Sequence, residues 1–182
     1  IVAIALFVRP SWGLESGVAF AIEFAGYLFL MTGLAIRIWC IFYVGGRKSK
    51  ALITEGPYSL CRNPLYVGTF LLTIGVALCF ENLVMLIVCP LIIIPTHFAV
   101  VLMEERHLEE IFGDEFRAYK TKTPRFWPRF TNYRSAAMLT VPTRIIGRIA
   151  LDAMAVLLLP QVEDLLELLH VSGVLPVLWR FP

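Results

Sequence analysis

Charged residues are scarce in this sequence: 16% of its 182 residues are Asp, Glu, Lys or Arg, whereas soluble domains contain about a quarter. The formal net charge of +2 is too small to indicate a protein that binds nucleic acid. Glycine-rich phosphate-binding loops of the dinucleotide type and of the P-loop type are also missing. These absences argue against a soluble nucleotide-binding enzyme.

Cysteine and histidine patterns give no sign of a metal centre. The four cysteines never form a CxxC pair, and three of them lie in apolar segments, so we expect small core-filling side chains: Cys40, Cys61, Cys79 and Cys89. His97 lies two helical turns before Glu104, so the two share a helix face as a polar pair would. Because no second histidine follows at ligand spacing, we predict no metal site.

Hydrophobic residues are abundant instead, at 58% of the chain with a mean hydropathy of +0.75. They gather in three long runs, at Gly17–Val44, Leu65–Phe80 and Leu83–Met103. Such blocks predict an all-α integral membrane bundle. The short gap between the second and third runs predicts a tight helical hairpin, and we interpret Ile1–Val8 as the end of another membrane helix.

Positive charges predict how the hairpin is oriented. Basic residues lie before it (Arg47, Lys48, Lys50 and Arg62) and after it (Arg106, Arg117, Lys120, Lys122, Arg125, Arg129 and Arg134), whereas its tip has none. Both flanking segments are therefore expected in the cytoplasm. Two crossings between them agree with that orientation, since an even number returns the chain to the side where it started.

The chain after the hairpin continues with helical periodicity, which we expect to break at Gly113. Pro90 and Pro95 should kink the helix before that point. Beyond residue 148 we expect Pro160 to interrupt a short apolar stretch, and the sequence leaves open whether the chain crosses the membrane, re-enters it or lies on its surface. In total we expect about four or five membrane helices in one domain over 1–182, with N-terminal helices in 1–44, a core in 45–130 and C-terminal helices in 131–182.

Polar residues gather at the cytoplasmic mouth of the hairpin, in the stretch EGPYSLCRNPLY. Pro64 suits the first turn of the second run, and Asn63 before it is a natural N-cap. Because a hairpin places the start of one arm beside the end of the other, Asn63 and Tyr66 should lie near Glu104.

The segments GPYSLCRNPLYVG and EERHLEEIFGDEFRAYKTKTPRFWPR together resemble the isoprenylcysteine carboxyl methyltransferase family. The phosphatidylethanolamine N-methyltransferases look similar in outline. The resemblance covers about Gly45 to Phe130. It implies an integral membrane enzyme that transfers a methyl group from S-adenosylmethionine to a lipophilic acceptor. The implied cofactor cavity is walled by the hairpin, closed by the segment after it, and open to the cytosol and sideways to the bilayer.

The resemblance also implies which residues border the cofactor. Carried over position by position, they are Lys50, Ala51, Leu52, Ile53, Tyr58, Asn63, Pro64, Leu65, Tyr66 and Glu104. Two positions depart from the family pattern. Asn63 stands where the family usually has histidine, and Val100 stands where the enzymes that act on prenylcysteine have arginine.

Chemical reasoning assigns roles to these side chains. Methyl transfer requires the nucleophile, the methyl carbon and the sulfur to be held in line more than it requires acid–base chemistry. Arg62 suits a carboxylate, Glu104 suits an ammonium or ribose hydroxyls, and Tyr58 or Tyr66 suits a sulfonium through cation–π attraction. Glu105 would be a general base if the acceptor carries a proton that must be removed. Arg62 and Glu105 are thus the candidate catalytic residues.

Two alternatives stay open at this point. One is a membrane reductase of the steroid-reductase type that binds NADPH, and the other is a non-catalytic membrane scaffold. The acceptor is also open, with a prenylated carboxylate, a lipid amine and a small hydrophobic thiol as candidates. Besides this substrate and membrane lipids, no partner is indicated, and the oligomeric state is undetermined.

Overall fold

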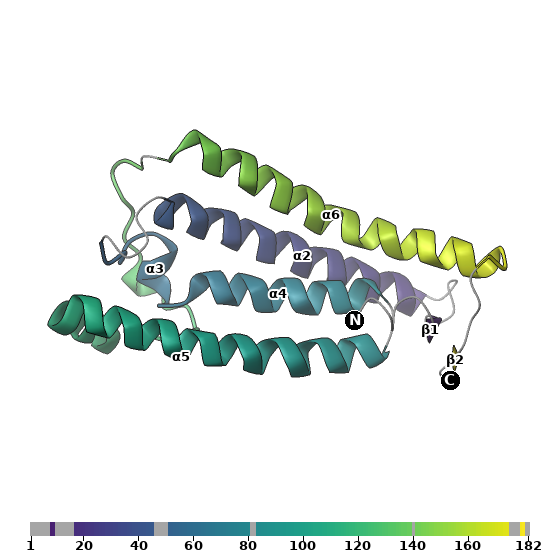
Figure 1. Ribbon diagram of the computed structural model, residues 1–182, viewed down its shortest axis with the longest axis horizontal. Helices are drawn as coiled ribbons and strands as arrows, with labels where there is room; N and C mark the ends of the chain where they lie inside the picture. Colours follow the sequence, from purple (N-terminus) through teal and green to yellow (C-terminus); the bar gives the residue numbers. More distant parts are fainter. Residues whose placement is uncertain are drawn as a thin grey trace.

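The computed structural model describes residues 8–9, 17–45, 51–80, 83–139, 141–174 and 179–180, which form long helices lying side by side (Figure 1). The helices are α2 (Gly17–Val44), α3 (Pro57–Leu60), α4 (Pro64–Cys79), α5 (Leu83–Lys122) and α6 (Thr143–Val171), with a 3-10 helix η1 (Phe130–Asn132). Two-residue strands β1 (Val8–Arg9) and β2 (Trp179–Arg180) pair in parallel. The predicted all-α class is confirmed.

Three helical segments are long and apolar enough to cross a membrane: Gly17–Val44, Val84–Lys122 and Thr143–Val162. Helix α4 is shorter, because its 16 residues extend only about 24 Å. Large apolar side chains such as Phe20, Leu91 and Leu151 are exposed on the helices that have spanning length, as a surface facing lipid requires. The chain is therefore an integral membrane protein, whereas four or five membrane helices stay a prediction.

Helices α2 and α4 pack against each other through glycines. Gly26 and Gly33 lie two turns apart on α2, and Gly68 and Gly75 lie two turns apart on α4. A Cβ atom added at Gly33 would lie 2.7 Å from the carbonyl oxygen of Gly68, and one added at Gly75 would lie 2.7 Å from the backbone nitrogen of Leu30. Small residues let the two backbones approach closely, as is typical of membrane helices.

Helices α4 and α5 form the predicted hairpin (Figure 1). Its expected tip, Glu81 and Asn82, lies outside the described residues. Helix α5 continues through Pro90 and Pro95, and its backbone leaves helical angles at Gly113 (φ 50°, ψ −120°), where the break was predicted.

The chain reverses direction at Gly113. Lys120 Nζ lies 2.9 Å from Glu109 Oε2 although the two residues are 11 positions apart. An unbroken helix would separate them by about 16 Å. Residues 114–122, called the return arm below, thus fold back over the end of the first part of α5.

Near the ends of the chain, the structure corrects two expectations. Helix α6 runs through Pro160 over 29 residues, so the expected interruption at this proline is wrong. The membrane helix expected over Ile1–Val8 is wrong at Val8, because that residue pairs with Trp179 in a strand. The other residues of that segment, 1–7, lie outside the part of the chain that the structure describes.

Candidate functional site

The loop before α4 is held in place by the segment that follows α5. The backbone N–H groups of Arg62 and Asn63 donate to the carbonyl oxygens of Pro124 (2.8 Å) and Arg125 (3.1 Å). Farther along, the N–H of Arg129 donates to the carbonyl oxygen of Leu60 (3.0 Å). The two polar sequence motifs are therefore hydrogen-bonded to each other, at the end of the bundle where α3 lies (Figure 1).

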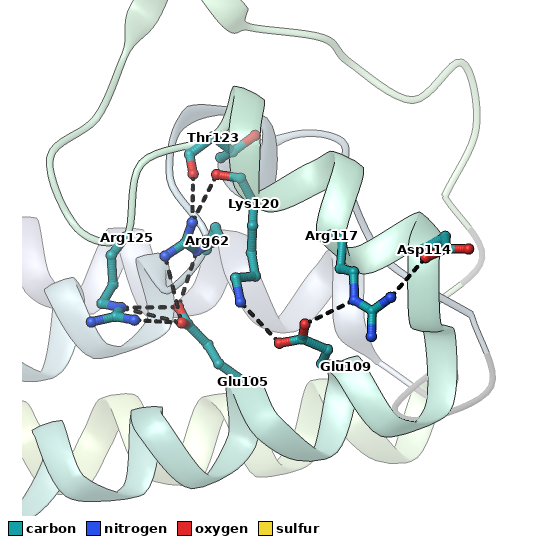
Figure 2. Close-up of polar contacts among 8 residues, drawn as sticks. All are labelled: Arg62, Glu105, Glu109, Asp114, Arg117, Lys120, Thr123 and Arg125. Atoms are coloured by element: carbon teal, nitrogen blue, oxygen red, sulfur yellow. Dashed lines mark hydrogen bonds and ion pairs between the residues drawn. The ribbon is translucent and has the colours of Figure 1, made fainter.

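A buried ion cluster joins these segments to α5 (Figure 2). The Glu105 carboxylate accepts hydrogen bonds from Arg62 Nε (3.0 Å), Asn63 Nδ2 (2.8 Å) and Arg125 Nη2 (2.8 Å). The side chains of Glu105 and Arg62 are only 7% and 11% exposed. Charge-assisted bonds in such a dry environment are strong, so the cluster fixes the geometry of the loop.

The guanidinium of Arg62 is also engaged on its other side. Its Nη1 donates to the carbonyl oxygens of Lys120 (3.0 Å) and Thr123 (3.1 Å) at the end of α5. The same guanidinium therefore neutralises Glu105 and satisfies two carbonyl oxygens that a helix end leaves without partners.

The predicted N-cap is half right. Helix α4 begins at Pro64 directly after Asn63, as expected, but the Asn63 side chain makes no capping hydrogen bond. Its amide instead donates to Glu105 and to the carbonyl oxygen of Arg125 (3.4 Å). The charge-assisted bond from Nδ2 to the buried Glu105 carboxylate therefore orients this side chain, and the first turn of α4 does not.

A second polar pair lies on the hairpin beside the cluster. The Tyr66 hydroxyl donates to Glu104 Oε2 at 3.0 Å, which places these two residues together as predicted. The ring of His97 contacts the Tyr66 ring edge-on, with centroids 6.0 Å apart, and its Nδ1 lies 2.9 Å from the carbonyl oxygen of Ile93. No group of three or more metal-binding side chains is found within the described ranges.

A cavity of about 540 Å³ opens at this place. Ten of the twelve residues proposed from the sequence line it. They are both catalytic candidates and eight of the residues that border the cofactor by resemblance: Ala51, Leu52, Ile53, Tyr58, Arg62, Asn63, Leu65, Tyr66, Glu104 and Glu105. Pro64 is buried beside it and is not part of the lining. Lys50 lies outside the described residues.

The inner wall of the cavity is apolar and carries neutral hydroxyl and thiol groups. Burial raises the pKa of the Tyr58 phenol, so this ring stays neutral. Cys61 is buried next to Arg62 and is not part of the lining; burial raises its pKa to about 11, and its thiol stays protonated. The Tyr119 hydroxyl donates to the carbonyl oxygen of Tyr58 at 2.6 Å and ties the return arm to α3.

Sequence reasoning missed several lining and supporting residues. Cys40, Ile41 and Val44 at the end of α2 line the cavity, as do Phe116 and Tyr119 of the return arm. The helical spacing of the last two was visible in the sequence, but only the reversal at Gly113 turns them toward the cavity.

Aromatic packing holds the segment after α5 in place. The Phe126 ring lies 5.7 Å from the Phe70 ring and 5.9 Å from the Phe98 ring, measured between centroids. The Arg125 guanidinium lies 5.9 Å from the centroid of the Phe98 ring. The position of Phe126 between α4 and α5 depends on this tertiary packing and could not be predicted from residue spacing.

The fold and the cavity define the class of the protein, an integral membrane helical bundle that has, at one end, a cavity lined by both polar and apolar side chains. Within that class, the sequence matches the phospholipid methyltransferase family over residues 17–115, more than half of the chain. The protein belongs to this family, which confirms the resemblance to the membrane methyltransferases.

Two of the similar proteins are named for metal resistance. The chain is 39% identical over 139 residues to the cobalt-zinc-cadmium resistance protein CzcN of Cupriavidus metallidurans, covering 76% of this chain and 64% of that protein. It is 31% identical over 182 residues to the nickel-cobalt-cadmium resistance protein NccN of Alcaligenes xylosoxydans xylosoxydans, covering all of this chain and 85% of that protein.

A named enzyme is more distantly similar. The protein-S-isoprenylcysteine O-methyltransferase of Schizosaccharomyces pombe is 31% identical over 77 residues, which are 42% of this chain and 33% of that enzyme. No solved structure matches the chain significantly.

Proposed function

We propose that this protein is an S-adenosylmethionine-dependent methyltransferase that modifies a lipophilic acceptor at the membrane. The observation that carries the proposal is the convergence of two motifs, separated by the hairpin, on one cavity. Its volume of about 540 Å³ lies within the range of roughly 300–1,000 Å³ usual for small-molecule sites.

The lining residues suit the chemical groups of this cofactor. Glu104, oriented by the Tyr66 hydroxyl at 3.0 Å, offers a carboxylate to an ammonium or to ribose hydroxyls. The neutral Tyr58 ring and the Tyr66 ring offer aromatic surface to a sulfonium. When bound, the cofactor supplies an electrophilic methyl carbon, and the apolar lining from α2 keeps water away from it.

Arg62 and Glu105 are better suited to holding the site than to reacting in it. Two hydrogen bonds from the Arg62 guanidinium go to Glu105, and two more go to carbonyl oxygens. A general base must accept a proton, and Glu105 could do so only by giving up charge-assisted hydrogen bonds in a buried place. We therefore propose that these two residues position the loop.

The acceptor is better matched by an amine or a neutral nucleophile than by a carboxylate. Of the arginines and lysines among the described residues, the one that lines the cavity is Arg62, and it is bound to Glu105. Val100, which takes the place of the family's arginine, offers no charge. A carboxylate acceptor would therefore lie near the carboxylates of Glu104 and Glu105. The lining arginine would not pair with the acceptor, because it is bound to Glu105.

The test uses the full-length protein in detergent or nanodiscs. We expect binding of S-adenosylhomocysteine by calorimetry and transfer of labelled methyl from S-adenosylmethionine into a lipid extract. Glu104→Ala should weaken that binding, and Glu115→Ala on the exposed surface serves as the matched control. Binding of NADPH without binding of S-adenosylhomocysteine would overturn the proposal in favour of a membrane reductase.

The names of two relatives suggest where this activity operates. Because CzcN and NccN are named for resistance to cobalt, cadmium, zinc or nickel, we propose that methyl transfer by this protein supports metal tolerance. Cells that carry Glu104→Ala should then grow as poorly on cadmium as cells without the gene. Full tolerance with this variant would favour a non-catalytic scaffold.

A further inference from the structure

Two carboxylates one helical turn apart on α5 bind the segment that follows Gly113 (Figure 2). Glu105 binds Arg62 and Arg125 in a buried place, with 7% of its side chain exposed. Glu109 accepts hydrogen bonds from Lys120 Nζ (2.9 Å) and Arg117 Nε (3.1 Å), with 30% of its side chain exposed. The inner cluster is sheltered from water and the outer one is accessible to it.

The outer cluster is connected to the cavity wall. Besides binding Glu109, the Lys120 ammonium lies 5.8 Å from the centroid of the Phe116 ring. Phe116 is almost fully buried and lines the cavity together with Tyr119, the next turn of the return arm. A change in the Glu109–Lys120 contact would thus alter the surroundings of the Phe116 ring, which lines the cavity.

The return arm also has a hinge. Gly113 adopts φ 50° and ψ −120°, a conformation that is essentially accessible only to glycine. An added Cβ atom at this position would meet no heavy atom within 4 Å. The side of Gly113 where a Cβ atom would point is therefore open, while Glu109 holds the arm and Glu105 holds Arg125 just after it.

We propose that Glu109 is a positioning residue that, through Lys120 and Arg117, holds the return arm closed over the cavity and so limits the release of the cofactor. Exposed ion pairs break far more easily than buried ones. The arm accordingly opens at its contacts with Glu109, while Arg125, just after the arm, stays attached to Glu105. This inference rests on the proposed binding of S-adenosylmethionine and names how access to that same site is controlled.

The experiment compares Glu109→Gln with Glu115→Gln in the full-length protein. Glu115 is an exposed carboxylate on the return arm, and it forms no hydrogen bond or ion pair with the described residues, so its variant removes the same charge and no contact. Hydrogen exchange of residues 114–122 without ligand should rise in Glu109→Gln and stay unchanged in Glu115→Gln. Equal exchange in the two variants would overturn the proposal.

Ligand release gives the second readout. Dissociation of labelled S-adenosylhomocysteine should be about three- to tenfold faster in Glu109→Gln, the size expected from losing two exposed ion pairs. The Michaelis constant for S-adenosylmethionine should rise with little change in kcat. Wild-type release by Glu109→Gln would refute the positioning role. If S-adenosylhomocysteine did not bind to the wild-type protein, the proposed function would be refuted instead. The hydrogen-exchange measurement would still test whether Glu109 holds the return arm closed.

Discussion

Replacing Glu105 by glutamine tests whether the buried ion cluster holds the two motifs together. The substitution keeps the size of the side chain and removes its charge. Three donors lose a carboxylate partner as a result: Arg62 at 3.0 Å, Asn63 at 2.8 Å and Arg125 at 2.8 Å. One of the amide hydrogens of the new side chain would also face a guanidinium.

The size of the effect follows from burial. Removing one partner of a buried ion pair costs about 3–5 kcal/mol, because the remaining charge stays buried without compensation. Arg62 is 11% exposed, whereas Arg125 is 36% exposed and can be hydrated. We therefore expect the lower end, about 3 kcal/mol, which corresponds to a fall in the apparent melting temperature of roughly 6–12 °C for a chain of this length.

The cysteines provide an assay, since Cys40, Cys61, Cys79 and Cys89 are buried thiols that form no disulfides with one another. A thiol-reactive dye therefore reports unfolding in detergent as these thiols become accessible. Glu104→Gln is the matched control, because the neighbouring carboxylate is bonded to Tyr66 at 3.0 Å outside the ion cluster. It should cost at most about 1.5 kcal/mol. Equal melting temperatures for the two variants would refute the reasoning.

Three further substitutions test other parts of the structure. Tyr66→Phe removes the hydroxyl that orients Glu104. The affinity for S-adenosylhomocysteine, measured by calorimetry, should therefore fall about threefold to tenfold, and an unchanged affinity would contradict that orientation. Gly68→Ala should lower stability by about 1–3 kcal/mol, because its Cβ would lie 2.9 Å from the carbonyl oxygen of Gly33; the thiol assay should show no such loss for Gly147→Ala, where no atom lies within 4 Å. Gly113→Ala should cost about 1–3 kcal/mol through backbone strain alone, and a wild-type melting temperature would argue against the sharp reversal.

Local patterns predicted those features that depend on neighbouring residues. The apolar runs predicted the hairpin of α4 and α5, and the glycine before Asp114 predicted the break in α5. The pairing of Tyr66 with Glu104 also followed, because a tight hairpin fixes which residues of its two arms lie side by side. Helical periodicity and turn chemistry suffice for features of this kind.

Features that depend on distant partners could not be predicted in this way. Asn63 has the local pattern of an N-cap, yet its amide bonds to Glu105, 42 residues away. Nothing in the local sequence ranks these two partners, because the choice depends on the buried charge that Arg62 and Arg125 also surround. The same applies to Phe116 and Tyr119, whose place in the cavity wall depends on the direction in which the chain leaves Gly113.

The arrangement around Asn63 explains how an asparagine can serve where related enzymes have histidine. Consecutive helix residues point about 100° apart, so Glu104 turns to Tyr66 while Glu105 turns to Asn63 and the arginines. What Glu105 requires from position 63 is a hydrogen-bond donor, and the Asn63 amide supplies one at 2.8 Å with a second N–H directed to a backbone carbonyl. A side chain that titrates is not needed for that task. The departure at Asn63 is therefore compatible with the proposed methyl transfer.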